Sequence, residues 1–434
     1  MNKNDYMYLD HAATTPMREV AFEAYKKTEM DAYANSSGGH ALSRKAKNIL
    51  EESREFISSC FGAAPNEITF TSGGTEADNW IIKTPFVDQE KKSELTTTQI
   101  EHEAVLASAE NVDKKGYKVN FVSCDEDGVT NIEELKQSIN TNTLIASVMY
   151  ANNETGVIQP IKEISQSVKD INPKTLFHSD VVQAVASNKI DFHSLGIDSA
   201  AISGHKIGGP KGIGVMFLKT GYKIPSLLHG GKQELERRAG TVNVSGVAGL
   251  AAALKEQQQN LEEETKLIEK ERIIFESKIK EEFDVKIIGE NVRRLCHISN
   301  IQFRDINSET LMVALDLNGM GVSRGSACAS GAQKPSHVLK AMNVEDRVIN
   351  NHLRFSFGWN IEIGDGNFSM TGGWHSIQCI HGSSEWLGYE ATGKSITMRV
   401  MDFYLHNEGL IRENWVPIDI IHILKQIGLS LIHI

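Results

Sequence analysis

The chain has 434 residues, of which 40% are hydrophobic and 23% are charged. This length suggests about two or three domains, and the composition excludes a globally disordered chain. The 45 Lys and Arg residues against 56 Asp and Glu residues give a net charge of −11, which argues against direct nucleic-acid binding and a cationic membrane anchor. No apolar run reaches the ~18 residues of a membrane-spanning helix, and the N-terminus carries no signal-peptide core. We therefore expect a cytoplasmic protein.

Helical and strand patterns alternate through the first half of the chain. The sequence predicts helices over 46–61, 75–83 and 161–171, and strands over 67–71, 143–150, 175–178, 200–203 and 214–218. Strands separated by helices build a mostly parallel sheet with helices on both faces. Ligands of such sheets bind at the carboxyl ends of the strands, so the residues that follow each strand are the candidates for chemistry.

The second half begins with a long charged helix over 261–283, which we interpret as a solvated connector between domains. The patterns after it predict a smaller α+β domain with strands over 285–289 and 297–303 and a helix over 309–317. The composition changes after residue 364, where three of the five tryptophans fall and the pattern becomes rich in strands. We treat this C-terminal stretch as a separate segment.

The first candidate motif is the stretch 70–79 (FTSGGTEADN), in which a strand ends, small residues turn and a helix begins. Unpaired backbone N–H groups at a helix start can hold a phosphate, and Thr75 can add a hydroxyl donor. A simple Ser/Thr-capped helix explains the stretch equally well. The stretch is no Walker loop, because no Gly-Lys-Ser/Thr follows the turn.

The second motif places Lys206 just past a short apolar strand, in the small-residue stretch 203–212 (SGHKIGGPKG). A partly buried lysine has a lowered pKa and can form a Schiff base. Most lysines in Gly-rich turns are surface residues, but the flanking Ser203 and His205 could donate to an anion and favour a functional site.

Two further strand ends carry polar residues. Asp180, in 178–183 (HSDVVQ), could pair with a protonated pyridine nitrogen, although a helix N-cap is an equally good interpretation. Asn153, in 150–156 (YANNETG), could bond a ring hydroxyl, although an Asn- and Gly-rich turn explains that stretch on its own.

The five cysteines are scattered and form no Cys-x-x-Cys pair, which argues against a disulfide framework and a zinc ribbon. Cys328 lies in the Gly- and Ser-rich stretch 323–331 (SRGSACASG), close in sequence to Arg324, which would favour its thiolate. An inert thiol is the commoner case for any one cysteine, but Cys328 is the best candidate for a reactive one. Together, an amine, an acid, a phosphate cup and a separate thiol suggest pyridoxal phosphate.

The motifs resemble those of the cysteine desulfurases of the NifS and IscS type, within the class V aminotransferases. The resemblance runs from about residue 8 to 359, and its landmarks stand in family order: YLDHAATTP, TSGGTEADN, IEHEAVL, ANNETG, HSDVVQA, SGHKIGGPKGIG, RRAGTVNV, GSACASG and LRFSFG. It implies an α/β protein of PLP-dependent transferase fold type I. The sheet would be mostly parallel and of the seven-stranded type, with a smaller α+β domain and a β-rich C-terminal segment.

The resemblance also implies site residues. Lys206 would bind the cofactor aldehyde and move the α-proton, and Asp180 would pair with the ring nitrogen. His102 would stack on the ring and help proton transfer, and Arg354 would bind the substrate carboxylate. Cys328 would be the sulfur-accepting nucleophile. The remaining cofactor-binding residues would be Gly74, Thr75, Asn153, Gln183, Ser203, His205 and, reaching the phosphate of the other subunit, Thr241. Asn153 would also contact the substrate.

In this family, L-cysteine becomes L-alanine and its sulfur passes through a persulfide on the cysteine to an acceptor thiol. The resemblance therefore implies an acceptor protein such as an iron–sulfur scaffold, a role in iron–sulfur cluster assembly or tRNA thiolation, and a homodimer. Cys328 could also share a transient [2Fe–2S] cluster with that scaffold. The alternatives are another class V enzyme, such as a selenocysteine lyase or an aminotransferase, and a non-catalytic binding protein.

The chain departs from the family pattern at Gly74, where Ala is frequent, and most clearly after residue 360. The C-terminal patterns resemble half of a SnoaL-like polyketide cyclase domain, too little to close its curved sheet, and we interpret the ending as a chimeric or truncated reading frame. The expected domains are 1–15 (N-terminal part of the small domain), 16–259 (large cofactor-binding domain), 260–363 (small domain) and 364–434 (the partial SnoaL-like segment).

Overall fold

The computed structural model describes residues 6–87, 89–304, 306–325 and 335–359, and the backbone of 361–365, 368–380, 395–407 and 410–415. It divides into two compact units, Met1–Phe357 and Gly358–Ile434. Cys328, the predicted nucleophile, falls between residues 325 and 335 and so lies outside the described residues. None of the helices in the described part is both long and apolar enough to cross a membrane.

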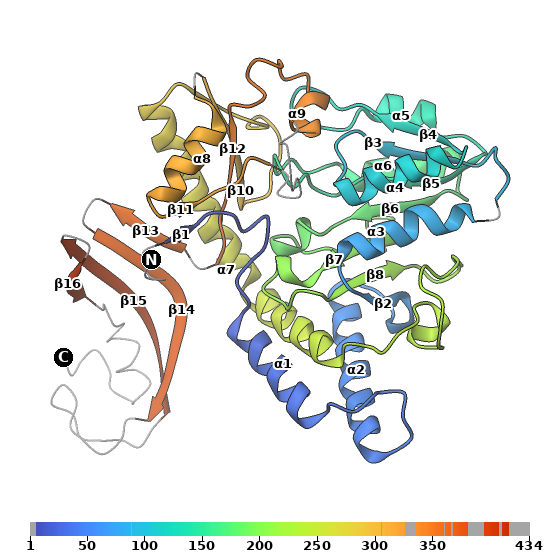
Figure 1. Cartoon of the computed structure of the whole chain (residues 1–434), viewed down its shortest axis with the longest axis horizontal. Coiled ribbons are helices and arrows are strands. Elements are labelled where there is room, and N and C mark those ends of the chain that lie inside the picture. Colours follow the sequence, from blue (N-terminus) through green and yellow to red (C-terminus); the bar gives the residue numbers. More distant parts are fainter. Residues whose placement is uncertain are drawn as a thin grey trace, which may run out of the picture. The chain divides into compact units, whose positions relative to one another are not determined.

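A mixed sheet forms the centre of the first unit (Figure 1). Within the described residues it has seven strands in the order β2–β8–β7–β6–β5–β3–β4. Neighbouring strands pair in parallel, except that β8 runs antiparallel to both β2 and β7. The strands are β2 (Ile68–Thr71), β3 (Glu94–Thr98), β4 (Lys118–Val122), β5 (Thr143–Ser147), β6 (Leu176–Asp180), β7 (Ser199–Ser203) and β8 (Gly214–Leu218). The predicted fold class, a mostly parallel sheet between helices, is confirmed.

Apolar side chains alternate along the strands and supply a core to each face of this sheet. On one face, Ala201 and Met216 pack with residues of α3 (Gly74–Lys83) and α4 (Glu103–Lys114). On the other face, Ile202 and Val215 pack with residues of four further helices. Those helices are α2 (Ala41–Cys60), α5 (Ile132–Ser138), α6 (Ile161–Ile171) and α7 (Val244–Glu282).

The helix α7 corrects one expectation. The charged stretch 261–283 is the second half of a 39-residue helix, and it is not solvated all round. Glu264 is buried and forms a two-pronged ion pair with buried Arg18, at 2.9 and 2.7 Å, just before α1 (Glu19–Asp31). Arg272 bonds Glu276 one turn further along, at 2.9 Å. Glu264, Arg272 and Glu276 thus lie buried along this half of α7, which is possible because each has a partner of opposite charge.

A smaller sheet in the order β12–β10–β9 follows α7 and is antiparallel throughout. Its strands are β9 (Val285–Ile287), β10 (Ile298–Phe303) and β12 (His352–Ser356), and α8 (Ser308–Leu317) and α9 (His337–Ala341) belong to the same region. The N-terminal strand β1 (Met7–Tyr8) pairs with β11 (Met320–Gly321), and Asp10 forms a bridge with Ser356. The N-terminal segment is thereby fixed beside β12 before it enters the large domain.

The second unit contains an antiparallel sheet in the order β13–β14–β15–β16. Its strands are β13 (Ile361–Asp365), β14 (Phe368–Ile380), β15 (Ser395–Asn407) and β16 (Leu410–Trp415). The β-rich C-terminal segment that the sequence indicates is therefore present as strands. Its likeness to a partial cyclase domain stays a prediction.

Candidate active site

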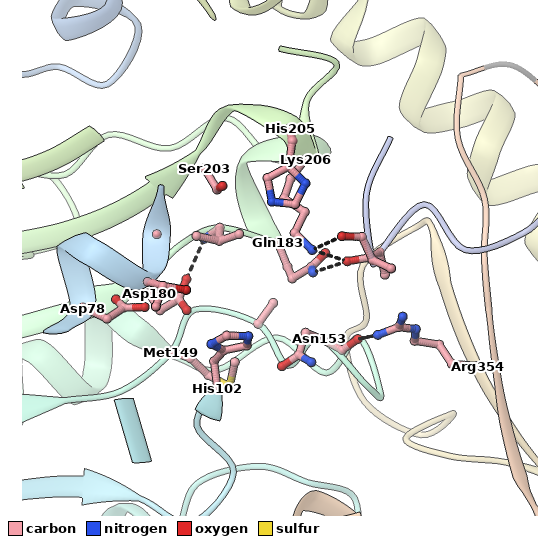
Figure 2. A pocket seen from close by; sticks show the side chains of 16 residues that line it. Asp78, His102, Met149, Asn153, Asp180, Gln183, Ser203, His205, Lys206 and Arg354 are labelled. Atoms are coloured by element: carbon pink, nitrogen blue, oxygen red, sulfur yellow. Dashed lines mark hydrogen bonds between the residues drawn. The ribbon is translucent and has the colours of Figure 1, made fainter. Parts of the chain in front are cut away.

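A cavity of about 190 Å³ opens where the strands of the large sheet end (Figure 2). Ten of the residues singled out from the sequence line it: Gly74, Thr75, His102, Asn153, Asp180, Gln183, Ser203, His205, Lys206 and Arg354. Thr241 lies exposed on the loop before α7 and is not among the described residues that line this cavity.

The fold brings these side chains together because most of them follow a strand or begin a helix, whereas Arg354 lies within β12. Asp180 ends β6, Ser203 ends β7, and Lys206 closes the short 3₁₀ turn Gly204–Lys206 that follows. Thr75 lies in the first turn of α3, directly after β2, and His102 is the N-cap of α4. The carboxyl ends of parallel strands share one edge of a sheet, so residues far apart in sequence meet there.

Lys206 is held by the N-terminal segment. Its Nζ donates hydrogen bonds to the main-chain oxygens of Ala12, at 2.5 Å, and Ala13, at 2.7 Å. Gln183 donates from Nε2 to the same Ala12 oxygen at 2.8 Å, and His205 Nδ1 lies 3.0 Å from the Thr14 hydroxyl. The segment that follows β1 thus forms one wall of the cavity (Figure 2).

The floor of the cavity is a buried cluster of acids and histidines. Burial and the neighbouring Asp78 carboxyl raise the pKa of Asp180 to about 7, and burial raises the pKa of Asp78 to about 8. Burial lowers the pKa of His102 and lowers that of His178, which lies 3.2 Å from Asp78, to about 4. The cluster therefore carries protons on its carboxyls more readily than on its histidines, and a cation next to Asp180 would draw the proton off that carboxyl.

The group Asp78, His102 and Asp180 brings three potential ligand atoms within 4.8 Å of one another. Two of these residues are the ones expected to contact the pyridine ring, so this group belongs to the cofactor cavity. Asp78 itself was missed by sequence reasoning. Its position three residues after Thr75 on a helix was the available signal, because that spacing places both on one face.

The donor set fits pyridoxal phosphate. The first turn of α3 offers backbone N–H groups for a phosphate, and Thr75 and Ser203, which carry hydroxyls, line the same cavity. Gly74 keeps this end open, because a Cβ there would lie 2.7 Å from Val182 Cγ2. In the same cavity, Asp180 matches a ring nitrogen and Lys206 supplies the amine for an aldehyde.

Arg354 supplies a cation at the cavity edge. It is only 2% exposed, and its guanidinium donates to Asp10 Oδ1 at 2.7 Å and to the Asn153 main-chain oxygen at 2.8 Å. Its buried Nε has no hydrogen-bond partner in the described part of the chain. A buried donor without a partner is costly, so this guanidinium retains hydrogen-bonding capacity beyond its bonds to Asp10 and Asn153.

Three of the other cysteines are poor nucleophiles. Burial raises the pKa of Cys60, Cys124 and Cys296 to about 11 each, so their thiols stay protonated at neutral pH. Arg324, which the sequence places near Cys328, donates to Asn350 Oδ1 at 3.3 Å and lies 3.6 Å from Glu309.

Comparison with known proteins agrees with this geometry. The aminotransferase class-V family model matches residues 7–365. The cysteine desulfurase IscS of Clostridium botulinum (strain Hall) is 40% identical over 362 residues, which cover 82% of this chain and 90% of the relative. That of Dictyoglomus turgidum is 37% identical over 366 residues, covering 84% and 92%.

A solved structure of a NifS-like protein superposes with a TM-score of 0.77 at 34% identity, over 81% of this chain and 94% of the other. The family-model match over residues 7–365 includes every described residue that lines the cavity. The chain belongs to the class V aminotransferases, among the cysteine desulfurases of the IscS and NifS type.

Proposed function

We propose that the protein is a pyridoxal-phosphate-dependent cysteine desulfurase, which converts L-cysteine to L-alanine and passes the sulfur to an acceptor. The observation that carries this proposal is the meeting of Lys206, Asp180 and the first turn of α3 in one cavity. When bound, pyridoxal phosphate supplies an aldehyde that condenses with amines and a ring that accepts an electron pair.

In this proposal the residues that line the cavity bind different parts of the cofactor. Asp180 would pair with the ring nitrogen, and His102 would stack on the ring. Gln183 and Asn153 would bond the ring oxygen. Four residues at and near the first turn of α3 would hold the phosphate: Gly74, Thr75, Ser203 and His205. Burial and the cationic Lys206 and Lys211 lower the pKa of His205 to about 4, so His205 binds as a neutral imidazole.

Lys206 is the residue that moves protons. Its Nζ reaches the carbonyls of Ala12 and Ala13, which hold the side chain at the cavity wall. There its amine can take the α-proton of L-cysteine and later return a proton to the product. Arg354 binds the substrate carboxylate through its guanidinium, next to the Asn153 carbonyl.

Cys328 is the proposed nucleophile of the sulfur transfer. Its thiolate attacks the sulfur of the substrate, so that a sulfur–sulfur bond forms and the substrate's carbon–sulfur bond breaks. The electron pair of the broken bond goes to the substrate's β-carbon, which takes up a proton and becomes the methyl group of alanine. The two sulfur atoms are oxidised to a persulfide and the carbon is reduced, so the step needs no further oxidant.

We also propose a homodimer in which Thr241 reaches the phosphate of the partner subunit. Thr241 is exposed, and large apolar side chains lie exposed on and beside α1: Met17, Val20, Phe22, Met30 and Tyr33. Clustered exposed apolar residues are typical of subunit interfaces. An iron–sulfur scaffold as acceptor, a transient [2Fe–2S] cluster bound through Cys328, tRNA thiolation and a cytoplasmic location stay predictions from the sequence.

A visible absorbance spectrum of the purified protein tests the proposal, followed by L-cysteine with a thiol reductant and assays of alanine and sulfide. We expect cofactor absorbance that is lost in Lys206→Ala, and both products in wild type. Cys328→Ser should keep the absorbance and lose turnover. A coloured protein inert to L-cysteine would favour another class V reaction, and a colourless one would overturn the cofactor assignment.

A further inference from the structure

Glu154 is a buried acid next to the cavity that the mechanism above does not use. It is 0% exposed and follows Asn153 on the loop after β5. Its backbone needs no help from its side chain, because its N–H donates to Asn152 Oδ1 at 2.9 Å and its carbonyl accepts from Asn300 Nδ2 at 3.2 Å. The turn is therefore fixed without the carboxylate, whose burial is costly unless it is hydrogen-bonded.

The Glu154 carboxylate instead contacts Ser336 and Gly325. Its Oε2 accepts a hydrogen bond from the Ser336 hydroxyl at 2.5 Å, across 182 residues of sequence. The same oxygen packs against Gly325, where an added Cβ would lie only 2.8 Å away. Gly325 and Ser336 stand just before and just after the segment that contains Cys328, so one carboxylate contacts both flanks of that segment.

Both flanks are also bonded to other parts of the cavity wall. Ser336 caps α9 by accepting from Leu339 N at 3.1 Å, and the ring of the next residue, His337, lies 2.9 Å from the main-chain oxygen of Glu101, which precedes His102. On the other flank, Ser323 and Arg354 exchange two backbone hydrogen bonds, at 3.2 and 2.7 Å.

We propose that Glu154 is a positioning residue for sulfur transfer: it fixes Gly325 and Ser336 against the loop of Asn153, and so sets where the intervening segment delivers the Cys328 thiol. This inference rests on the proposed function. It separates two parts of the reaction, because in the proposed function cofactor and substrate contact Asn153 and Arg354, whereas the Glu154 carboxylate contacts the two flanks.

The test uses the pyridoxal-phosphate-loaded full chain and the variants Glu154→Ala, Glu154→Gln and Ser336→Ala. Ser123→Ala is a matched control, because Ser123 is a half-buried serine that donates to a glutamate, Glu134, away from the cavity. One equivalent of L-cysteine is added without reductant. Two rates are followed, the cysteine-induced change in cofactor absorbance and the appearance of persulfide on Cys328 by mass spectrometry.

We expect Glu154→Ala and Ser336→Ala to slow persulfide formation about tenfold, with the absorbance change as fast as in wild type. Glu154→Gln, whose side-chain oxygen can still accept from Ser336, should restore most of the rate, and the double variant Glu154→Ala/Ser336→Ala should be no slower than Glu154→Ala alone. Amide hydrogen exchange in residues 335–341 should be faster in both alanine variants and unchanged in Ser123→Ala.

Wild-type persulfide rates in Glu154→Ala and Ser336→Ala would overturn the inference and leave the proposed function intact. Loss of the cofactor absorbance and of the cysteine-induced change in step with persulfide formation would also overturn it, because Glu154 would then support the whole fold. A wild-type protein that binds the cofactor but forms no persulfide would overturn the proposed function and this inference with it.

Discussion

The side-chain amine of Lys206 donates to the main-chain oxygen of Ala12 at 2.5 Å, although 194 residues separate them in the chain. The contact joins the N-terminal segment to the turn after β7, and Gln183 donates to the same oxygen. The residue proposed to bind the cofactor therefore also holds part of the fold together.

Changing Lys206 should separate these two roles. Lys206→Arg keeps a cation that can donate to the carbonyls of Ala12 and Ala13, but it offers no primary amine. We expect it to lose the visible absorbance of the cofactor while unfolding close to wild type. Lys206→Ala should lose the absorbance and also about 1–3 kcal/mol of stability, the usual range for a charged hydrogen bond. Urea unfolding of the cofactor-free proteins measures this; equal stability of the two variants would contradict it.

Gly74 should tolerate alanine only if its neighbour is reduced in size. A Cβ at Gly74 would lie 2.7 Å from Val182 Cγ2, and Val182 is β-branched and cannot easily turn away. We expect Gly74→Ala to weaken pyridoxal phosphate binding about tenfold, since overpacking costs roughly 1–3 kcal/mol. Gly74→Ala/Val182→Ala should recover most of the affinity. Fluorescence titration with the cofactor measures both; a double variant as weak as the single one would argue against the steric cause.

Asp78 should make the cofactor-free protein less stable as the pH rises. Burial raises its pKa to about 8, so between pH 5 and 8 the folded state holds a proton that the unfolded state has released, and stability falls with pH. The slope approaches about 1.4 kcal/mol per pH unit for one proton. Asp78→Asn removes this contribution. The histidines are present in both proteins, so their contribution to the pH dependence cancels when the unfolding free energy of one protein is subtracted from that of the other. A difference constant from pH 5 to pH 8 would contradict the prediction.

Arg354→Lys should mainly affect substrate binding. Lysine keeps the charge but cannot reach Asp10, the Asn153 carbonyl and a carboxylate in one planar arrangement. We expect KM for L-cysteine to rise about 10- to 100-fold, with a smaller change in kcat. Steady-state alanine release at varied L-cysteine concentration measures both constants. A loss confined to kcat would instead place Arg354 in the chemical step.

A chain ending at Trp359 should still bind the cofactor. All described residues that line the cavity lie between Ala12 and Arg354, and the boundary between the two compact units falls at Phe357 and Gly358. We expect the truncated protein to show the same absorbance as the full chain. A colourless truncated protein would mean that the second unit supports the first.

Sequence patterns predicted some elements well and missed others for physical reasons. The apolar strand β8 and the amphipathic helix α6 match the predicted ranges 214–218 and 161–171. The strand β3 reads ELTTT and has no apolar alternation, yet all five residues are buried because β5 and β4 flank it. Local pattern cannot reveal a polar strand whose burial comes from its neighbours.

At the candidate site, too, sequence patterns predicted some residues and missed others. Lys206 and Asp180 follow from motifs that lie at predicted strand ends, so local pattern was enough to single them out. His102 came from the family resemblance alone, because neither β3 before it nor α4 after it was predicted. The Ala12 and Ala13 carbonyls carry no side-chain signal, and their role depends on where β1 pairs with β11. The contact between Glu154 and Ser336 likewise joins two motifs that nothing in their local sequence connects.

The cavity draws on residues from Ala12 to Arg354, and this spread has a consequence for biosynthesis. A ribosome-bound chain that has released only the large sheet lacks the Arg354 wall, so the substrate-binding side of the cavity is complete only after synthesis has passed β12. The cofactor binds the folded chain and stabilises it by mass action. Cellular supply of the cofactor would thus govern how long the completed enzyme survives, in addition to how fast it works.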